Sequence, residues 1–171
     1  VLDLGTGSGC LLLSILHELP RAVGIGVDRS AGALRVAEDN AERLGLAPRC
    51  RFFEGNWFSA LDNSGVDPFD IVLTNPPYIA DGEMMELAPE IIGFEPGSAL
   101  RAGADGLDCY REILDRLAAW LRPGGLFVGE IGQSQGAQAA TMASDGGLLS
   151  VEVVDDAAGN PRCLVGHWQD Q

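Results

Sequence analysis

The chain has 171 residues, of which 25 are acidic, 11 are arginine and none is lysine, so its formal net charge is −14. With 46% hydrophobic and 21% charged residues, the composition excludes a disordered or fibrous protein and indicates one globular domain. Phosphate contacts need clustered basic side chains, and here the arginines are scattered singly. The composition therefore argues against a self-sufficient DNA or RNA binder and favours a protein or small-molecule partner.

Apolar, β-branched runs alternate with segments of helical period, which is typical of a parallel sheet covered by helices on both faces. The expected strands are residues 1–4, 22–27, 51–54, 69–74 and 126–131. The expected helices are residues 9–19, 31–44, 107–121 and 135–144, with Ser30 as the N-cap of the second and residues 122–125 as a turn. A closing hairpin is expected from residues 148–154 and 162–167.

These elements predict an α/β fold with a doubly wound, mostly parallel sheet that ends in a C-terminal antiparallel hairpin. We expect residues 1–171 to form a single domain. Regular periodicity lapses between Asn75 and Gly106. This segment is too long for a plain connection, so we expect part of it to be functional. The chain starts with Val1, and its first apolar run enters a turn almost at once, so we expect the first strand to be truncated at its N-terminal end.

The four cysteines, Cys10, Cys50, Cys109 and Cys163, stand far apart without a CxxC pair. This spacing gives no sign of a zinc site or a disulfide framework, so we expect no metal and a reducing, cytoplasmic setting. No apolar run approaches the ~18 residues that span a bilayer, and no leader pattern is present, so we expect no membrane association. We also expect a monomer.

A glycine-rich turn, hereafter the glycine turn, follows the first expected strand. It consists of Gly5, Thr6, Gly7, Ser8 and Gly9. The turn lies at the carboxyl edge of the expected sheet, where open α/β folds bind ligands, and its glycines allow close approach of the backbone. Asp28 follows the second expected strand, where a carboxylate can bond ribose hydroxyls. Together these features favour a cofactor that carries a nucleoside.

The positions of the glycines in this turn distinguish a dinucleotide cofactor from S-adenosylmethionine. A dinucleotide fingerprint would need a third glycine at the position of Cys10. The chain instead has Asp3, Gly5, Gly7 and Gly9, in the pattern DxGxGxG, which resembles motif I of class I S-adenosylmethionine methyltransferases. The resemblance implies a Rossmann-like methyltransferase sheet, and S-adenosylmethionine as the cofactor with S-adenosylhomocysteine as its product.

The second motif, hereafter the acceptor loop, directly follows the fourth expected strand and consists of Asn75, Pro76, Pro77 and Tyr78. An amide or ring amine is a poor nucleophile because its lone pair is delocalised, so an enzyme that methylates it must orient the nitrogen. Asn75 can offer a side-chain oxygen and Pro76 a backbone carbonyl to the two N–H bonds, while Tyr78 can stack on a planar group. The motif resembles amino-group methyltransferases that act on adenine, cytosine or a glutamine amide.

Further segments of the sequence favour one of these classes of amino-group methyltransferase. They are Gly55-Asn56-Trp57-Phe58, Gly93-Phe94-Glu95-Pro96, residues 103–111, Glu130-Ile131-Gly132 and Gln135-Gly136. Together with the two motifs they resemble the peptide chain release factor glutamine methyltransferases, the PrmC or HemK family, over residues 1–168. The resemblance implies methylation of the side-chain amide nitrogen of the GGQ glutamine in class 1 release factors. It also implies an N-terminal helical domain that helps grip the release factor, and we expect that domain to be absent from the present sequence.

The resemblance assigns roles residue by residue. The cofactor would be held by the glycine turn, Asp28, Trp57 and Asn75, and the glutamine by Asn75, Pro76, Pro77 and Tyr78, with Asn75, Pro76 and Tyr78 taking part in catalysis. Glu95 and Glu130 are expected to brace the acceptor loop.

Three alternatives remain open at this point. One is a DNA or RNA amino-methyltransferase, which would need a basic target surface. Another is a nicotinamide-dependent oxidoreductase, which shares the fold. The third is a cofactor-binding module without catalysis.

Overall fold

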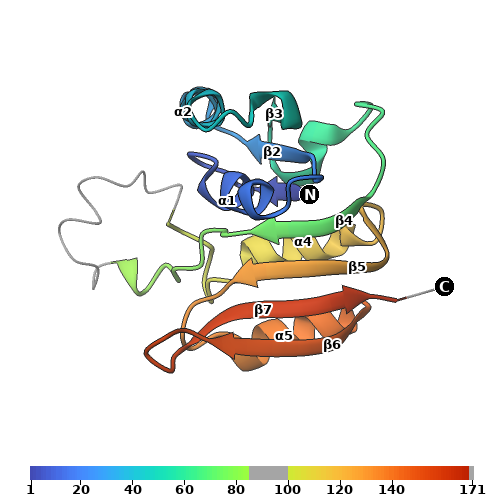
Figure 1. Cartoon of the computed structure of the whole chain (residues 1–171). Coiled ribbons are helices and arrows are strands. Elements are labelled where there is room, and N and C mark those ends of the chain that lie inside the picture. Colours follow the sequence, from blue (N-terminus) through green and yellow to red (C-terminus); the bar gives the residue numbers. More distant parts are fainter. Residues whose placement is uncertain (85–99, 170–171) are drawn as a thin grey trace.

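The computed structural model describes residues 1–84 and 100–169, and these residues form one seven-stranded sheet with helices on both faces (Figure 1). The strands are β1 (Leu2–Leu4), β2 (Gly24–Asp28), β3 (Cys50–Glu54), β4 (Phe69–Thr74), β5 (Leu121–Glu130), β6 (Leu148–Asp155) and β7 (Pro161–Trp168). The α-helices are α1 (Cys10–Glu18), α2 (Ala31–Arg43), α4 (Asp108–Leu117) and α5 (Gly136–Asp145). Two 3₁₀ turns, η1 (Ala47–Arg49) and η2 (Trp57–Leu61), flank β3.

The strand order is β3-β2-β1-β4-β5-β7-β6. Strands β1 to β5 pair in parallel, whereas β7 lies antiparallel to both β5 and β6. The order reverses between β1 and β4, so this is the point of the sheet where ligands are expected at the carboxyl ends. Leu4 lies opposite both Val27 and Thr74, which brings the residues that follow these three strands to the same edge.

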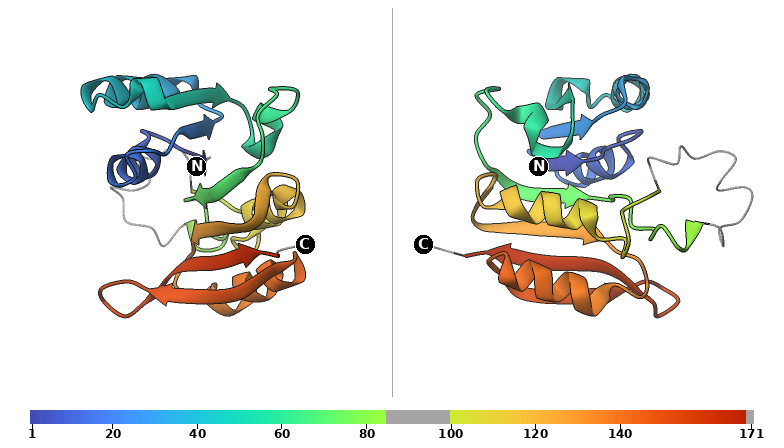
Figure 2. Two further views of the ribbon diagram at one scale, coloured as in Figure 1. Left: turned by 45° about the vertical axis from the view of Figure 1, so that its right-hand side comes forward. Right: turned by 180° about the vertical axis from the view of Figure 1, so that it is seen from behind.

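Helices α1 and α2 cover one face of the sheet, and α4 and α5 cover the other (Figure 2). Each helix buries one apolar stripe. In α1 the buried residues are Leu12, Leu13 and Leu16; in α4 they are Tyr110, Ile113, Leu114 and Leu117. This arrangement confirms the doubly wound, mostly parallel sheet with a C-terminal antiparallel pair that the sequence predicts.

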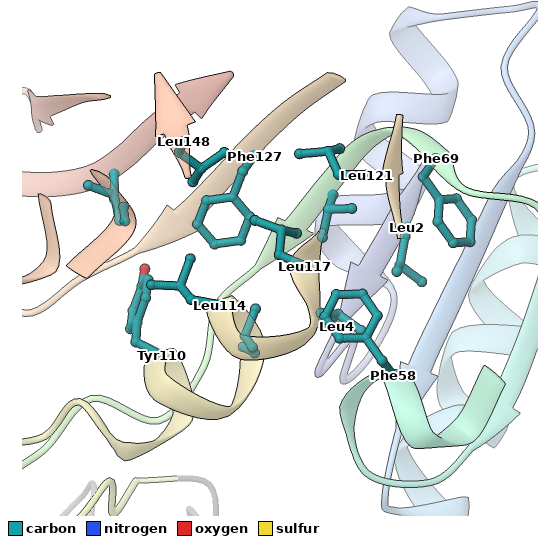
Figure 3. Packing of buried hydrophobic residues seen from close by; sticks show 14 of the residues in the cluster. Leu2, Leu4, Phe58, Phe69, Tyr110, Leu114, Leu117, Leu121, Phe127 and Leu148 are labelled. Atoms are coloured by element: carbon teal, nitrogen blue, oxygen red, sulfur yellow. The ribbon is translucent and has the colours of Figure 1, made fainter. Parts of the chain in front are cut away.

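The larger core cluster lies between the sheet and the layer that contains α4, α5 and η2, and it includes Leu2, Leu4, Phe58 and Phe127 (Figure 3). Tyr110 packs edge-on against Phe127, with ring centroids 6.4 Å apart, and its hydroxyl donates a 2.7 Å hydrogen bond to the Glu130 carbonyl. This bond satisfies the one polar atom of a fully buried ring. The last residue of β5 is therefore fixed from within the core.

The boundaries near β5 differ from the prediction. Helix α4 ends at Leu117, and Leu121 belongs to β5, where it pairs with Phe69. Residues 122–125, predicted as a turn before the strand, instead form a bulge within β5, because the next pair of the ladder joins Ile71 to Leu126. Proline has no N–H for the ladder, and Gly124 has a φ of 71°, so these residues leave the pairing while the strand resumes beyond them.

Candidate active site

The glycine turn connects β1 to α1 at the carboxyl edge of the sheet. The N–H groups of Gly5 and Thr6 both donate to the Val27 carbonyl, at 2.8 and 2.9 Å, which fixes the turn to the end of β2. Gly5 has a φ of 73°, and a side chain there would approach the Trp57 ring to 3.2 Å. The backbone conformation therefore favours glycine, and the indole leaves little room for a side chain.

The Asp28 carboxylate links three parts of this edge. One oxygen accepts a 2.9 Å hydrogen bond from the Gly7 N–H, and the other accepts a 2.9 Å hydrogen bond from the Ser30 N–H at the start of α2. The side chain is half-buried, and each of its oxygens keeps a further lone pair. Asp28 can therefore hold the turn and still accept hydrogen bonds from a ligand.

A second carboxylate lies beneath the turn. Asp3 is 1% exposed, and its Oδ2 accepts a 2.7 Å hydrogen bond from the Thr6 hydroxyl. Burial raises the pKa of Asp3 to about 6, because desolvation outweighs the hydrogen bond from Thr6, which acts in the opposite direction. Asp3 therefore stabilises the turn from inside and does not reach the ligand side.

A cavity of about 560 Å³ opens at this edge, a volume typical of small-molecule sites. It brings together six of the residues that the sequence predicts for the site. They are Gly5, Gly7, Asp28, Trp57, Asn75 and Pro77. The glycine turn and the acceptor loop thus face the same space, although they are about 70 residues apart in the chain.

The other predicted site residues lie around this cavity without lining it. Thr6 is buried and turned toward Asp3, and the Ser8 carbonyl accepts a 3.0 Å hydrogen bond from the Asn40 side chain. Gly9 packs closely against Leu13 and Ala37, where a side chain would come within 3.2 Å of either residue. These three residues shape the turn.

The acceptor loop begins where β4 ends. Asn75 is exposed on the cavity, and Pro76 is buried. The Tyr78 hydroxyl donates a 3.2 Å hydrogen bond to Glu130 Oε1, so Glu130 braces the loop as the sequence predicts. Burial, and then the Glu130 carboxylate, raise the pKa of Tyr78. The second predicted brace, Glu95, lies outside the described residues together with the rest of its segment.

Comparison with known proteins settles the family. A family model described as "Methyltransferase domain" matches residues 1–162. The chain belongs to this family of methyltransferase domains. The Rossmann-like methyltransferase fold predicted from the glycine turn is thereby confirmed.

The curated relatives of this methyltransferase domain carry the name "Release factor glutamine methyltransferase". The protein from Rhodospirillum rubrum is 44% identical over 165 residues, which cover 96% of this chain and 50% of the relative. The protein from Cereibacter sphaeroides is 46% identical over 164 residues, 96% of this chain and 58% of the relative. The resemblance to these enzymes is confirmed. The chain spans about half the length of the curated relatives it matches.

Solved structures show the same fold at low sequence identity. A methyltransferase from Pyrococcus furiosus has a TM-score of 0.67 at 16% identity, and the match covers 98% of this chain and 74% of that one. The Thermus thermophilus 16S rRNA N2 G1207 methyltransferase, solved in complex with AdoMet and guanosine, has a TM-score of 0.69 at 20% identity. The match covers 98% of this chain and 37% of that one. These likenesses establish the arrangement of the methyltransferase sheet.

The structure also adds cavity-lining residues that the sequence analysis did not assign to the site. They include Arg29, Ser30, Asn56, Arg101, Asp108, Cys109 and Glu112. The Asn56 side chain donates a 3.2 Å hydrogen bond to Glu112, which connects the loop after β3 to α4. Burial, with Glu112 and Asp108 nearby, raises the pKa of Cys109 to about 11, so its thiol stays protonated at neutral pH. Asn56 and Cys109 lie in segments quoted for the family resemblance, whereas nothing in the sequence marks Glu112.

Over residues 1–84 and 100–169, no group of three or more His, Cys, Asp or Glu side chains is placed to hold a metal ion. Within the same residues, no helix is long and apolar enough to cross a membrane. The four cysteines are free thiols.

Proposed function

We propose that this chain is a single catalytic domain that methylates the side-chain amide nitrogen of a glutamine, with S-adenosylmethionine as the methyl donor. The observation that supports this best is the shared cavity, because it is lined both by Gly5, Gly7 and Asp28 and by Asn75 and Pro77. A site for transfer between two molecules needs both binding regions in one space. The relatives named as release factor glutamine methyltransferases support a release factor glutamine as the acceptor. We assign it to the GGQ glutamine of a class 1 release factor, as the family resemblance implies.

The residues present fit S-adenosylmethionine. The glycine turn provides backbone free of side chains next to the cavity, and the free lone pairs of Asp28 can accept hydrogen bonds from ribose hydroxyls. Trp57 lines the cavity beside Gly5, where its ring can lie along an adenine face. When bound, this cofactor supplies an electrophilic methyl group on a sulfonium.

The acceptor loop supplies the orientation that an amide nitrogen needs. We assign the Asn75 side-chain oxygen and the Pro76 carbonyl to the two N–H bonds of the glutamine amide, so that the nitrogen is fixed toward the methyl group. Positioning of two reactants can lower the barrier by about 7–11 kcal/mol. Pro76 and Pro77 restrict the backbone of the loop, and we assign the face of Tyr78 to contact with the planar amide.

The proposal also includes the protein substrate, the oligomeric state and the cellular location. A class 1 release factor is the protein substrate, no nucleic acid is needed for methyl transfer, and the domain acts as a cytoplasmic monomer. The net charge of −14 supports a protein partner over nucleic acid.

The test is incubation of the chain with radiolabelled S-adenosylmethionine and a purified release factor, followed by peptide mass mapping. We expect one added methyl group on the GGQ glutamine and no label on a release factor whose GGQ glutamine is replaced by alanine. Label on DNA or RNA in a parallel reaction, with none on the release factor, would assign the domain to nucleic-acid amino groups instead. Binding of NAD in place of S-adenosylmethionine, measured by calorimetry, would overturn the cofactor assignment.

A further inference from the structure

We propose that Gln135 is a positioning residue that fixes the acceptor loop from the connection after β5, the strand next to β4 in the sheet. This inference rests on the function proposed above, because it concerns how the same acceptor site is held. Gln135 lies just before α5 and is 7% exposed, so it is one of the few buried polar side chains among the described residues. A buried amide is retained at low cost only when its hydrogen bonds are satisfied.

The Gln135 amide makes three hydrogen bonds to three different segments. Its Nε2 donates to the Tyr78 carbonyl at 2.8 Å and to the Asp105 carbonyl at 3.2 Å, and its Oε1 accepts from the Gly132 N–H at 2.8 Å. The side chain therefore joins the end of the acceptor loop, the loop before α4 and the connection from β5 to α5. Both of its donor hydrogens are used on backbone carbonyls that have no strand partner.

Two groups of Tyr78, its hydroxyl and its backbone carbonyl, are held by the residues that flank the β5–α5 connection. Its hydroxyl bonds Glu130, the last residue of β5, and its carbonyl bonds Gln135, the residue before α5. Asn75 is three residues before Tyr78, and the two intervening residues are prolines, whose φ angles are fixed. A constraint at Tyr78 is therefore transmitted through a stiff segment to the side chain that we assign to the acceptor nitrogen.

Two glycines leave the space that this contact needs. A methyl group on Gly106 would fall 2.3 Å from both Gln135 Nε2 and the Tyr78 carbonyl oxygen. A methyl group on Gly132 would fall 2.9 Å from Gln135 Oε1 and 3.5 Å from the Tyr78 ring. Gly106 also has a φ of 75°, so any other residue would be strained there. The chain thus keeps side chains away from both sides of the Gln135 amide.

The test compares Gln135→Met, which keeps the length of the side chain and removes its hydrogen bonds, with Gln138→Met. Gln138 is the matched control because its amide also bonds Asp105, at 3.0 Å to the carboxylate, but it is exposed and its hydrogen bond goes to Asp105 and not to Tyr78. We expect Gln135→Met to lower kcat about 10- to 100-fold with a change in cofactor Kd below about twofold. The control should retain the parent kcat.

Hydrogen exchange provides a readout that does not depend on the substrate. The Ile79 and Asp81 amides donate to the Leu100 and Gly103 carbonyls beyond the acceptor loop. In Gln135→Met these two amides should exchange about tenfold faster or more, whereas amides of the β6–β7 pair keep their rates. If the parent chain methylates no release factor, the proposed function fails, and the exchange result still decides the role of Gln135.

A second variant separates hydrogen bonding from folding. Gln135→Glu keeps the shape and the oxygen that accepts from Gly132, but an ionised carboxylate cannot donate to the Tyr78 carbonyl. We expect the same local loss of exchange protection from this variant if its melting curve stays cooperative. Parent values of kcat and of Ile79 exchange in either folded variant would overturn the proposal. Equal loss of protection across the whole domain, with cofactor binding lost as well, would overturn it in favour of a general structural role.

Discussion

The two motifs that meet at the cavity are stabilised in different ways. The glycine turn is held by residues 3 to 32 positions away in the chain, since its hydrogen-bond partners are Asp3, Val27, Asp28 and Asn40. The acceptor loop is held by residues more than 50 positions away, at the end of β5 and the start of α5. The cofactor half of the site is therefore encoded locally, whereas the acceptor half depends on the C-terminal third of the chain.

This difference extends into the antiparallel part of the sheet. Glu130 pairs with Cys163 of β7, and the Arg162 guanidinium lies 3.9 Å from its carboxylate. The residue that holds the Tyr78 hydroxyl is thus positioned by the closing hairpin. We therefore expect changes in the hairpin to lower the rate of methyl transfer more than they lower cofactor affinity. The following variants test whether the acceptor half and the cofactor half of the site can be separated in this way.

The largest effect is expected from Asn75→Ala, which removes the side chain that we assign to the acceptor nitrogen. Loss of one hydrogen-bonding group that acts in the transition state should lower kcat about 100- to 1000-fold, with a smaller change in cofactor affinity. Steady-state methylation of a release factor measures this effect. Asn63→Gly is the matched control, because Asn63 is exposed in the loop before β4, its φ of 63° suits glycine, and it does not line the cavity; this variant should retain the parent kcat. Parent turnover in a folded Asn75→Ala variant would remove Asn75 from the mechanism.

The next effect concerns the pH dependence of stability. The pKa of Asp3 is raised from 3.8 to about 6 in the folded chain, so the folded state binds a proton that the unfolded state has already lost between these values. The stabilising contribution of this proton is complete below pH ~4 and is lost as the pH rises through ~6. Between pH 4 and pH 8 the free energy of unfolding of the parent should fall by about 2–3 kcal/mol more than that of Asp3→Asn.

Urea unfolding of both proteins at a series of pH values checks this prediction. Because each protein is compared with itself at another pH, any constant cost of the new amide cancels. Parallel curves for the parent and Asp3→Asn would show that the buried carboxylate beneath the glycine turn does not titrate in this window.

The contrast between the two motifs also explains what the sequence could predict. The glycine turn, Asp28 and the order of strands follow from local patterns, because strand, turn and helix signals adjoin one another in the chain. The acceptor loop was identified by its residue types, and its place on the cavity follows from the end of β4.

Long-range contacts could not be derived in this way. The hydrogen bond from Gln135 to Tyr78 joins segments 57 residues apart, and the packing of Glu112 on the cavity depends on how α4 crosses the sheet. The start of β5 at Leu121 was missed for a related reason, since Pro123 and the glycines that follow predict a turn and only the pairing with β4 shows a bulge.

A third, smaller effect is expected from Asp28→Ala in the cofactor half. The loss of a charged acceptor for ribose hydroxyls costs about 1.5–3 kcal/mol, or about 10- to 100-fold in affinity for S-adenosylmethionine. The Gly7 and Ser30 N–H groups also lose their acceptor. Calorimetry measures the affinity, and Asp39→Ala, an exposed carboxylate on α2, should bind as the parent does. Unchanged affinity in Asp28→Ala would show that Asp28 only holds the turn.

The smallest effect is expected from Ser30→Ala, at the N-cap of α2. The Ser30 hydroxyl accepts a 3.2 Å hydrogen bond from the Ala33 N–H, and loss of such a cap costs about 1 kcal/mol, or about 2–4 °C in Tm for a chain of this size. The variant keeps the backbone N–H of residue 30, so Asp28 retains this donor and the glycine turn stays anchored. Cofactor affinity should therefore stay within about twofold of the parent value.

Ser14→Ala is the matched control for Ser30→Ala, because Ser14 is exposed within α1, where alanine favours the helix and Tm should not fall. Thermal unfolding and calorimetry on both variants separate the cap from the ligand site. If Ser30→Ala weakens cofactor binding as much as Asp28→Ala, the hydroxyl itself contacts the ligand. The cofactor half would then depend on a side chain of α2 as well as on Asp28 and the backbone of the glycine turn.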